Sequence, residues 1–370
     1  MSWRNSLGNE DIRRFLTNIA NALGVYVLVV SCMVMFASFI LQMDLSEAKY
    51  FEYQSIIEIG DFKFHELTHE DVKNMLEEER NNGTKERTWC QFPPKNMHGR
   101  QIYKYNLNVP DLDLKKLNSG FQHGGRYVPE DCLPIARIAI IIPYRDREKH
   151  LKILLHNIIP KLKRQKLDFT IYVIEQTHSS PFNRGMVRNI GFSEASKIAD
   201  YDCYIFNDVD TLMEDDRNMY LCNKRAVRHL LTGYDTHGYQ LDYLFLVGGV
   251  IAFTKEQFLK INGYTNQLFF WGGEDDELYK RMRCSGIKLY RPVDEIGKYT
   301  IISHHHDAKE PDRHKVLREN TDNDVIDGVK NLVYKRLEIE YKELYTRILV
   351  DIDEKLVRQS FLDALEKNNR

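Results

Sequence analysis

Apolar and polar positions alternate along the middle of the chain in a pattern that predicts strands followed by helices. The run at 138–143 is continuously apolar, which is typical of a strand buried on both faces. Apolar residues then recur at helix spacing between 151 and 162. The segments 169–174 and 203–206 repeat the strand pattern on either side of a helical stretch at 186–198. This order predicts a parallel α/β sheet, whose ligands bind beyond the carboxyl ends of its strands.

Two later segments also carry strand patterns. Residues 243–254 are strand-like, and residues 334–341 alternate in polarity. The second segment could close the sheet at an edge, because alternation suits a strand with one buried face. Residues 44–88 are charged and lack sustained periodicity, which predicts an exposed stem before the folded body. We expect that body to span 89–357, with a short tail at 358–370.

The chain has a long apolar segment near its start. No charged residue occurs from Phe15 to Met43, and a membrane-spanning helix needs about 20 apolar residues. A buried core helix and a cleaved signal peptide are the alternatives, but the apolar region of a signal peptide is usually only about 7–15 residues long. The length of the run therefore predicts an uncleaved transmembrane signal anchor over residues 16–43.

Charges on both sides of this segment predict its orientation. Arginines at positions 4, 13 and 14 precede it, whereas Asp44 and Glu47 follow it. Positively charged flanks stay on the cytoplasmic side of a membrane. Residues 1–15 would therefore form a cytoplasmic tail, and the rest of this single-pass type II protein would be lumenal.

Charge and cysteine usage agree with a lumenal body. The net charge of the 370 residues is −2, without the basic excess of nucleic-acid-binding proteins, so we expect no nucleic-acid partner. Of six cysteines, Cys32 lies in the apolar segment, and the other five predict two disulfides and one free thiol in an oxidising compartment. Asn82 begins the sequence Asn-Gly-Thr, which is a glycosylation acceptor in a lumenal protein.

The first candidate for chemistry is Asp208-Val209-Asp210, at the end of the third predicted strand. Alternate residues of a strand point the same way, so the two carboxylates could face one site. Hard divalent cations such as Mg²⁺ or Mn²⁺ bind carboxylate oxygens and use their free positions for phosphates. A pair of surface acids is the alternative interpretation.

The second candidate is an acidic run behind two glycines. Trp271-Gly272-Gly273 precedes four consecutive acids at 274–277. Acids at a helix start also suit the helix dipole, but this alternative does not explain the adjoining tryptophan and glycines. An aromatic ring can stack on a sugar face, and a carboxylate can deprotonate an acceptor hydroxyl.

Three further segments carry candidate ligands. Three histidines at 304–306 precede Asp307, which indicates either a metal ligand or a surface histidine cluster. Residues 143–147, Pro-Tyr-Arg-Asp-Arg, end the first strand, where arginines can meet a diphosphate or simply form a solvated loop. Residues 182–184, Phe-Asn-Arg, precede a helix, and a helix start favours anions.

Taken in order, these segments resemble the β1,4-galactosyltransferase family over residues 89–352. The resemblance rests on the segments 140–147, 182–184, 189–192, 208–210, 248–250, 261–264 and 271–276. It implies a GT-A-type nucleotide-sugar-binding fold of the α/β class, preceded by one transmembrane helix and a stem. It also implies a location in the Golgi membrane, with the catalytic domain in the lumen.

The resemblance implies roles for individual residues. Asp210 and His304 would bind Mn²⁺, with His306 as a further candidate ligand, and Asp275 would be the catalytic base. The acceptor would contact Gly273, Glu274, Asp275 and Asp276. The UDP-sugar donor would contact Pro143, Tyr144, Arg145, Arg147, Phe182, Asn183, Arg184, Val209, Leu246 and Trp271. The implied disulfides are Cys90 with Cys132 and Cys203 with Cys222, which leaves Cys284 free.

The implied reaction is a single displacement. Asp275 takes the proton of the acceptor 4-hydroxyl while that oxygen attacks the anomeric carbon, so an α-linked donor gives a β1,4 product. The metal neutralises charge on the UDP leaving group. In the family, the loops that carry the tryptophan and the metal histidine close after the donor binds, and Gly272 and Gly273 could act as hinges.

Leu246 bears on the choice of donor. In the family that this chain resembles, members that transfer galactose have a tyrosine at this position. The tyrosine crowds the 2-substituent of the donor sugar. Members that transfer N-acetylgalactosamine have a smaller aliphatic residue. A leucine leaves room for an N-acetyl group, which favours UDP-GalNAc over UDP-Gal, unless Leu246 only packs in the core.

Other departures from the family pattern bear on the acceptor. Phe269-Phe270 replaces Trp-Gly before Trp271, which allows a different loop closure, and residues 310–313 lack the usual Asn-Pro-Gln-Arg. The histidine run is similar to the His-x-His-Asp of the xylose-acceptor branch. We expect a terminal β-GlcNAc of a glycoprotein or glycolipid glycan as acceptor. The alternatives are transfer to the xylose of proteoglycan linkers, an inactive sugar-binding relative, and a non-catalytic metalloprotein that uses the histidine run.

Overall fold

The computed structural model describes residues 87–105, 114–304, 308–311, 313, 316–317 and 327–368. The predicted anchor at 16–43, Asn82 and His306 lie outside these residues, as does the predicted stem except for its last two positions. Among the described residues, no helix is both long enough and apolar enough to cross a membrane. The anchor, the glycosylation site and the second metal histidine therefore stay predictions.

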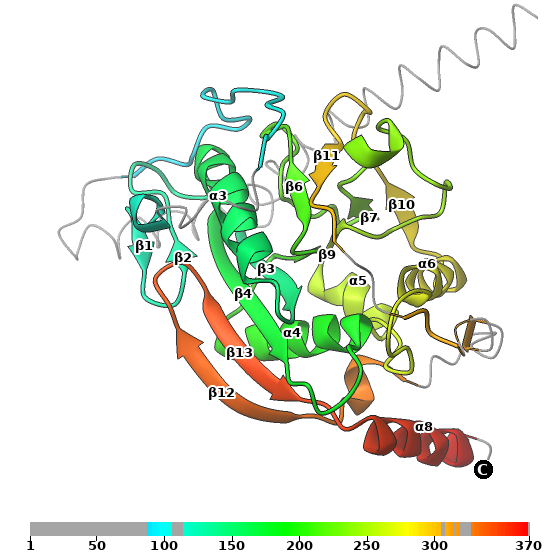
Figure 1. The fold of residues 1–370 in the computed structure, drawn as a ribbon. Coiled ribbons are helices and arrows are strands. Elements are labelled where there is room, and N and C mark those ends of the chain that lie inside the picture. Colours follow the sequence, from blue (N-terminus) through cyan, green and yellow to red (C-terminus); the bar gives the residue numbers. More distant parts are fainter. Residues whose placement is uncertain are drawn as a thin grey trace, which may run out of the picture. The chain divides into compact units, whose positions relative to one another are not determined.

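The first three predicted strands and both predicted helices are confirmed. The chain runs through β3 (Arg137–Tyr144), α3 (Glu148–Arg164), β4 (Asp168–Gln176), α4 (Arg184–Ile198) and β5 (Cys203–Asn207). β3 lies between β4 and β5 and pairs in parallel with both. The two helices are the crossover connections that a parallel arrangement requires. The carboxyl ends of β3, β4 and β5 therefore share one edge of the sheet (Figure 1).

Beyond β5 the sheet is mixed, so the prediction of a parallel sheet was wrong for this half. β9 (Val250–Phe253) pairs antiparallel with β5, β7 (Ala226–His229) pairs antiparallel with β9, and β10 (Lys288–Tyr290) pairs in parallel with β7. β5 ends at Asn207, which pairs with Val250 at the start of β9. β9 therefore starts at the edge of the sheet where β5 ends, and the two strands run in opposite directions.

The predicted strand at 243–254 begins only at Val250. The preceding residues form a loop, in which Gly249 takes a positive φ of 86°, a conformation that side chains with a Cβ rarely adopt. This loop, and not a strand, brings residues 243–249 toward the acidic run at 274–277.

The predicted edge strand is confirmed. β12 (Lys335–Tyr341) forms a hairpin with β13 (Thr346–Asp351), and β13 pairs in parallel with the second half of β4. The first half of β4 pairs with β2 (Arg126–Tyr127), which in turn pairs with β1 (Phe121–Gln122). Figure 1 shows β12 and β13 in orange along this side of the sheet.

A second, smaller sheet lies after the Asp-Val-Asp segment. It contains β6 (Thr211–Met213), β11 (Lys298–Ile301) and β8 (Gly233–Tyr234), with β11 in the middle. β11 pairs antiparallel with β6, so that Ile301 lies opposite Thr211. The pairing brings the chain that follows β11 back to the carboxyl end of β5.

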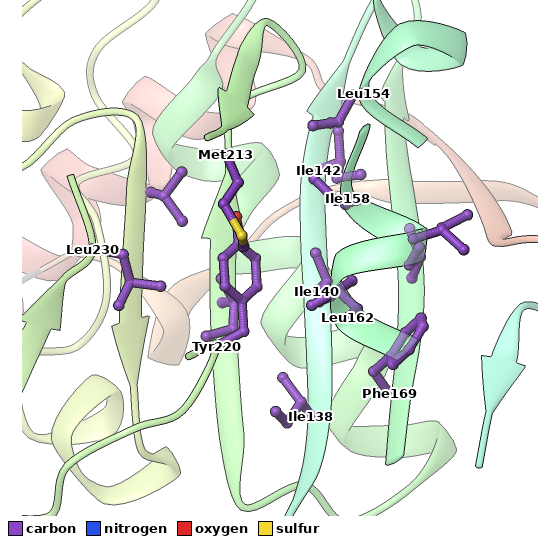
Figure 2. Close-up of a cluster of buried hydrophobic side chains, with 14 of the residues drawn as sticks. Ile138, Ile140, Ile142, Leu154, Ile158, Leu162, Phe169, Met213, Tyr220 and Leu230 are labelled. Carbon is purple, nitrogen blue, oxygen red and sulfur yellow. The ribbon is translucent and has the colours of Figure 1, made fainter. Parts of the chain in front are cut away.

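The alternation of β3 explains the two faces of the core. Ile138, Ile140 and Ile142 pack with residues of α3, as Figure 2 shows for Leu154, Ile158 and Leu162. Ala139 and Ile141 point the other way and pack with residues of α4. These five side chains are fully buried, as expected for a strand with helices on both faces.

Further helices occur among the described residues, and the longest of these is the last one. They are η1 (Leu114–Leu117), η2 (Asp235–His237), α5 (Lys255–Lys260), α6 (Glu274–Cys284), η3 (Val329–Asn331) and α8 (Glu354–Asn368). The domain boundary predicted at 357 falls inside α8. Both predicted disulfides are present, Cys90 with Cys132 and Cys203 with Cys222. Cys284 is free, as predicted, and it is exposed.

Candidate active site

A cleft of about 430 Å³ lies beyond the carboxyl ends of β3 and β5. Its walls come from five of the segments that the sequence marked for chemistry. The lining residues are Pro143, Arg145, Asp146, Arg147, His178, Phe182, Arg184, Asp208, Val209, Asp210, Phe270, Trp271 and His304. The cleft therefore unites the predicted metal ligands Asp210 and His304 with seven of the ten residues predicted to contact the donor.

Asp210 and His304 face each other in this cleft. His304 Nε2 lies 2.6 Å from Asp210 Oδ2, and Arg147 Nη2 donates to His304 Nδ1 at 2.9 Å. Burial disfavours the charged form of Asp210, but the hydrogen bond and charge of His304 outweigh it and hold the pKa of Asp210 below its usual value. Asp210 is therefore a carboxylate at neutral pH.

This pair fits one divalent cation. A carboxylate oxygen and an imidazole nitrogen are ligands that Mn²⁺ accepts. Within the described part of the chain, no group of three or more acidic, histidine or cysteine side chains could hold a metal ion. Asp210 and His304 would thus supply two ligands and leave further positions for phosphate oxygens, as is usual for metals that bind nucleotides.

Asp208 lines the same cleft, as expected for the two carboxylates, but it is paired with arginines and not with His304. Its Oδ1 accepts from Arg188 Nη2 at 2.5 Å, and its Oδ2 accepts from Arg184 Nη1 at 3.3 Å. Asp208 directly follows β5, and the turn after it points Asp210 toward His304. The side chain of Asp208 instead ties the metal loop to α4.

The acidic run forms the first turn of α6 behind the cleft. Glu274 is buried and accepts from Arg184 Nε at 2.6 Å. Asp275 Oδ1 accepts from Arg188 Nη1 at 3.1 Å, and Asp276 accepts from Tyr243 Oη at 2.7 Å. Each of the three carboxylates therefore has a different hydrogen-bond partner.

The environment of Asp275 suits a proton acceptor. Burial and the neighbouring charge of Glu274 raise the pKa of Asp275 to about 6, although Arg188 and Arg184 oppose this rise. A base whose pKa lies near neutrality is present as carboxylate and still accepts a proton readily. Its side chain is 14% exposed and lies 3.5 Å, through Oδ2, from Nη2 of the cleft residue Arg184.

Leu246 lies on the loop that covers Asp275. A Cβ built on Gly248 would lie 2.6 Å from Asp275 Oδ2 and 3.8 Å from Leu246 Cδ1. Only a glycine allows the loop to approach the carboxylate this closely. The Leu246 side chain is thus a neighbour of the predicted base, although it does not line the cleft itself.

The loop before α6 is connected to the segment after the histidine run. Trp271 N donates to Ala308 O at 3.0 Å, and Glu310 N donates to Trp271 O at 3.0 Å. Gly272 and Gly273 have φ values of 101° and 99°, which only glycine adopts without strain. The tryptophan loop and the histidine segment are therefore joined by backbone hydrogen bonds.

The comparisons with known proteins agree with this geometry. A family model described as the N-terminal region of glycosyl transferase group 7 matches residues 90–223, and one described as the N-terminal domain of galactosyltransferase matches 228–305. β-1,4-Galactosyltransferase 4 of Cricetulus griseus is 43% identical over 267 residues, which cover 71% of this chain and 76% of the relative. β-1,4-Galactosyltransferase 5 of Danio rerio is 42% identical over 274 residues, covering 72% of this chain and 71% of the relative.

The chain belongs to the β1,4-galactosyltransferase family.

A solved structure extends the similarity to the fold. The catalytic domain of Drosophila β1,4-galactosyltransferase 7, in complex with xylobiose, matches with a TM-score of 0.53 and 26% identity. The match covers 60% of this chain and 98% of that domain. A mutant of the same Drosophila enzyme matches equally well and was solved with manganese, UDP-Gal and xylobiose. The predicted GT-A-type fold is thus confirmed for the described part of this family member.

Some residues that the family resemblance assigned to the donor lie elsewhere. Asn183 is fully buried, caps α4 by accepting from Met186 N at 2.9 Å, and donates to Asn266 O at 2.7 Å. Tyr144 is half-buried against the core beside α3. Neither side chain lines the cleft.

The structure also adds residues that sequence reasoning missed. Phe270 lines the cleft with a φ of 65°, while its neighbour Phe269 is buried. Arg188 lies behind the cleft and contacts both Asp208 and Asp275. A signal for Arg188 was available, because it follows Arg184 by four residues and so lies on the same face of a helix.

Proposed function

We propose that this protein is an inverting, Mn²⁺-dependent glycosyltransferase that moves a hexose from a UDP-sugar to the 4-hydroxyl of a sugar acceptor. One observation carries the proposal. Arg184 lines the cleft that holds Asp210 and His304, and it also contacts Glu274 and Asp275. A metal site for a diphosphate and a base for an acceptor hydroxyl are therefore neighbours.

The residues around the proposed metal site would stabilise the UDP leaving group. Asp210 and His304 would hold the cation, which supplies positive charge against the diphosphate when bound. Arg145, Arg147 and Arg184 line the same cleft and add donors that suit phosphate oxygens. Arg145 is held by its hydrogen bond to Ser180 O at 3.0 Å and by the ring of Phe182, 5.0 Å from its guanidinium carbon.

Asp275 would deprotonate the nucleophile, which is the acceptor hydroxyl. Its carboxylate takes the proton of the acceptor 4-hydroxyl as that oxygen attacks the anomeric carbon from the face opposite UDP. One displacement inverts the α-linkage of the donor and gives a β-linked product. Glu274 is paired with Arg184 and Asp276 with Tyr243, so they orient the first turn of α6.

We propose UDP-GalNAc as the preferred donor and UDP-Gal as the alternative. Leu246 lies beside Gly248 on the loop over Asp275, where a leucine in place of tyrosine leaves space for an N-acetyl group. The alternative is supported by the relatives, whose names describe galactosyltransferases.

We propose a terminal β-GlcNAc as the acceptor. A xylose acceptor is the alternative, because the Drosophila structure that matches this fold contains xylobiose. The apolar segment at 16–43 supports placing the protein in the Golgi membrane as a single-pass type II protein with its catalytic domain in the lumen.

The deciding experiment uses the full chain made in a secretory host and extracted with a mild detergent. UDP-GalNAc and UDP-Gal are each offered with a β-GlcNAc glycoside or a β-xyloside, in Mn²⁺ or with EDTA. We expect transfer only in Mn²⁺, fastest from UDP-GalNAc to β-GlcNAc, and none by Asp210→Asn. Faster transfer from UDP-Gal would reject the donor proposal alone. Absence of transfer to either acceptor from a folded, UDP-binding chain would reject the enzymatic function.

A further inference from the structure

Arg188 is a buried arginine that the proposed chemistry leaves without a role. It lies on α4, one turn after Arg184, and its side chain is 1% exposed. Its guanidinium reaches in two directions. Nη2 donates to Asp208 Oδ1 at 2.5 Å, and Nη1 donates to Asp275 Oδ1 at 3.1 Å. Arg188 therefore joins the loop of the metal ligand Asp210 to the predicted base.

The burial of the Arg188 guanidinium is energetically unfavourable. A buried cation is costly unless it is fully paired, and Nε of Arg188 has no hydrogen-bond partner. The ring of Tyr264, 4.9 Å from the guanidinium carbon, covers one face. Apolar side chains in place of Arg188, Asp208 and Asp275 together would avoid that cost, so stability alone is a poor explanation for this buried set of charges.

We propose that Arg188 is a positioning residue that holds the base Asp275 at a set place relative to the metal loop. This inference rests on the proposed function, because it takes Asp275 as the base. Arg188 occupies Oδ1 of Asp275 and thereby directs Oδ2 toward Gly248 and Arg184. Oδ2 is the oxygen that receives the proton.

The contacts of Oδ2 support this assignment. Its nearest cation is Arg184 Nη2 at 3.5 Å, which is longer than a good hydrogen bond. On its other side, Gly248 leaves the space that a Cβ would fill. Oδ1 is used within the protein, whereas Oδ2 faces the glycine loop and the cleft residue Arg184.

A second role of Arg188 is electrostatic. The charged groups that act on Asp275 are Glu274 of α6, Asp208 of the metal loop, and Arg184 and Arg188 of α4. Asp276 on α6 is turned to Tyr243. Removing Arg188 takes away one of the two positive charges, so the pKa of Asp275 rises and the enzyme needs a higher pH.

Arg281 provides a matched control. It is also a buried arginine between two carboxylates, with Nε 2.6 Å from Glu277 and Nη2 2.8 Å from Asp327. Its partners lie away from the cleft. A substitution of Arg281 therefore reports what the loss of a buried ion pair does to stability without touching the base.

The test compares Arg188→Met and Arg188→Lys with Arg281→Met in the full chain. For both Arg188 variants we expect kcat to fall at least tenfold while KM for the UDP-sugar stays within about threefold, because the metal pair is intact. The acid limb of kcat/KM should move to higher pH, further for methionine than for lysine. Arg281→Met should lower Tm without moving the acid limb. An unchanged kcat and acid limb in folded Arg188 variants would overturn the proposal.

A second measurement does not depend on activity, so it separates this inference from the proposed function. Tm is compared among wild type, Arg188→Met, Asp275→Asn and the double variant. The double variant should lose less stability than the sum of the single losses, because both substitutions break the same contact. Strict additivity would overturn the inference even if the enzyme is active. If the wild type transfers no sugar, the proposed function fails, and this cycle still tells whether Arg188 holds Asp275.

Discussion

His304 Nε2 lies 2.6 Å from Asp210 Oδ2, although 94 residues separate the two in the chain. The pairing of two short strands produces this contact. β6 begins directly after Asp210, β11 ends three residues before His304, and Ile302 N donates to Asp210 O at 2.9 Å. The candidate metal site is therefore built on a backbone ladder, which holds it more firmly than two loops would.

This pair leads to a prediction about metal dependence. His304→Ala should lower activity by on the order of 100-fold or more, because one metal ligand and its charge stabilisation are lost. Binding of UDP in Mn²⁺, measured by calorimetry, should weaken in parallel. His123→Ala is the control, since that exposed imidazole contacts Tyr341 of β12. Equal UDP binding by the His304 variant and wild type in Mn²⁺ would contradict the assignment.

The raised pKa of Asp275 leads to a prediction about pH. Since the base must be ionised, kcat/KM should fall as pH drops through about 6. Asp275→Asn should lower kcat by on the order of 1,000-fold and keep UDP binding, whereas Asp276→Asn should retain the acid limb. An acid limb near pH 4 in the wild type would show that Asp275 is not the limiting base.

The same pKa has a consequence for stability. An unfolded aspartate ionises near pH 4, whereas the native Asp275 keeps its proton up to about pH 6. The folded state binds the proton more tightly, so this residue lowers the free energy of unfolding as pH rises through that window. Thermal melts between pH 4 and 7 should show a smaller decline in Asp275→Asn than in wild type. A larger decline would contradict the direction of the shift.

Leu246 can be tested as a determinant of the donor. Leu246→Tyr should shift the ratio of kcat/KM values toward UDP-Gal and away from UDP-GalNAc by at least tenfold, which one crowded contact can supply. Leu244→Tyr is a matched control, because that residue lies on the same loop and is 83% exposed. The same change of ratio in both variants would assign the effect to the loop as a whole.

Gly248 gives a steric prediction. A Cβ at this position would lie 2.6 Å from Asp275 Oδ2, so Gly248→Ala should displace the base and reduce kcat by about 100-fold. Gly238→Ala meets no atom within 4 Å but has a φ of 61°, so it should cost only a modest amount of stability. Full activity of Gly248→Ala would mean that the loop retreats without disturbing Asp275.

Much of the fold was predictable from local pattern. The apolar run of β3, the helix spacing of α3 and the alternation of β12 each reflect contacts that their own side chains must make. The antiparallel entry of β9 was not predictable in this way. Its direction depends on where the chain returns after the segment 208–249, and no periodicity within the strand records that.

The candidate site, like the fold, was predictable only in part from the sequence. Asp210, His304 and Asp275 were found because each lies in an unusual run of residues, and resemblance to a family supplied their roles. Asn183 caps α4, and the sequence did not distinguish this from an anion contact, because both use the same polar residue at the same position. Arg188 was missed, because its four-residue spacing from Arg184 predicts a shared helix face but does not say what that face contacts.

The sequence by itself determined which residues are candidates for chemistry and predicted on which strand ends and helix starts they lie. Only the tertiary structure decided which carboxylate faces His304, which is paired with arginines, and which oxygen of Asp275 accepts from Arg188. The physical reason is that charge and shape act through space. Asp208 and Asp210 are the same residue type and lie two positions apart in the chain. In the folded protein, two arginines of α4 lie beside Asp208, whereas the imidazole of His304 lies beside Asp210.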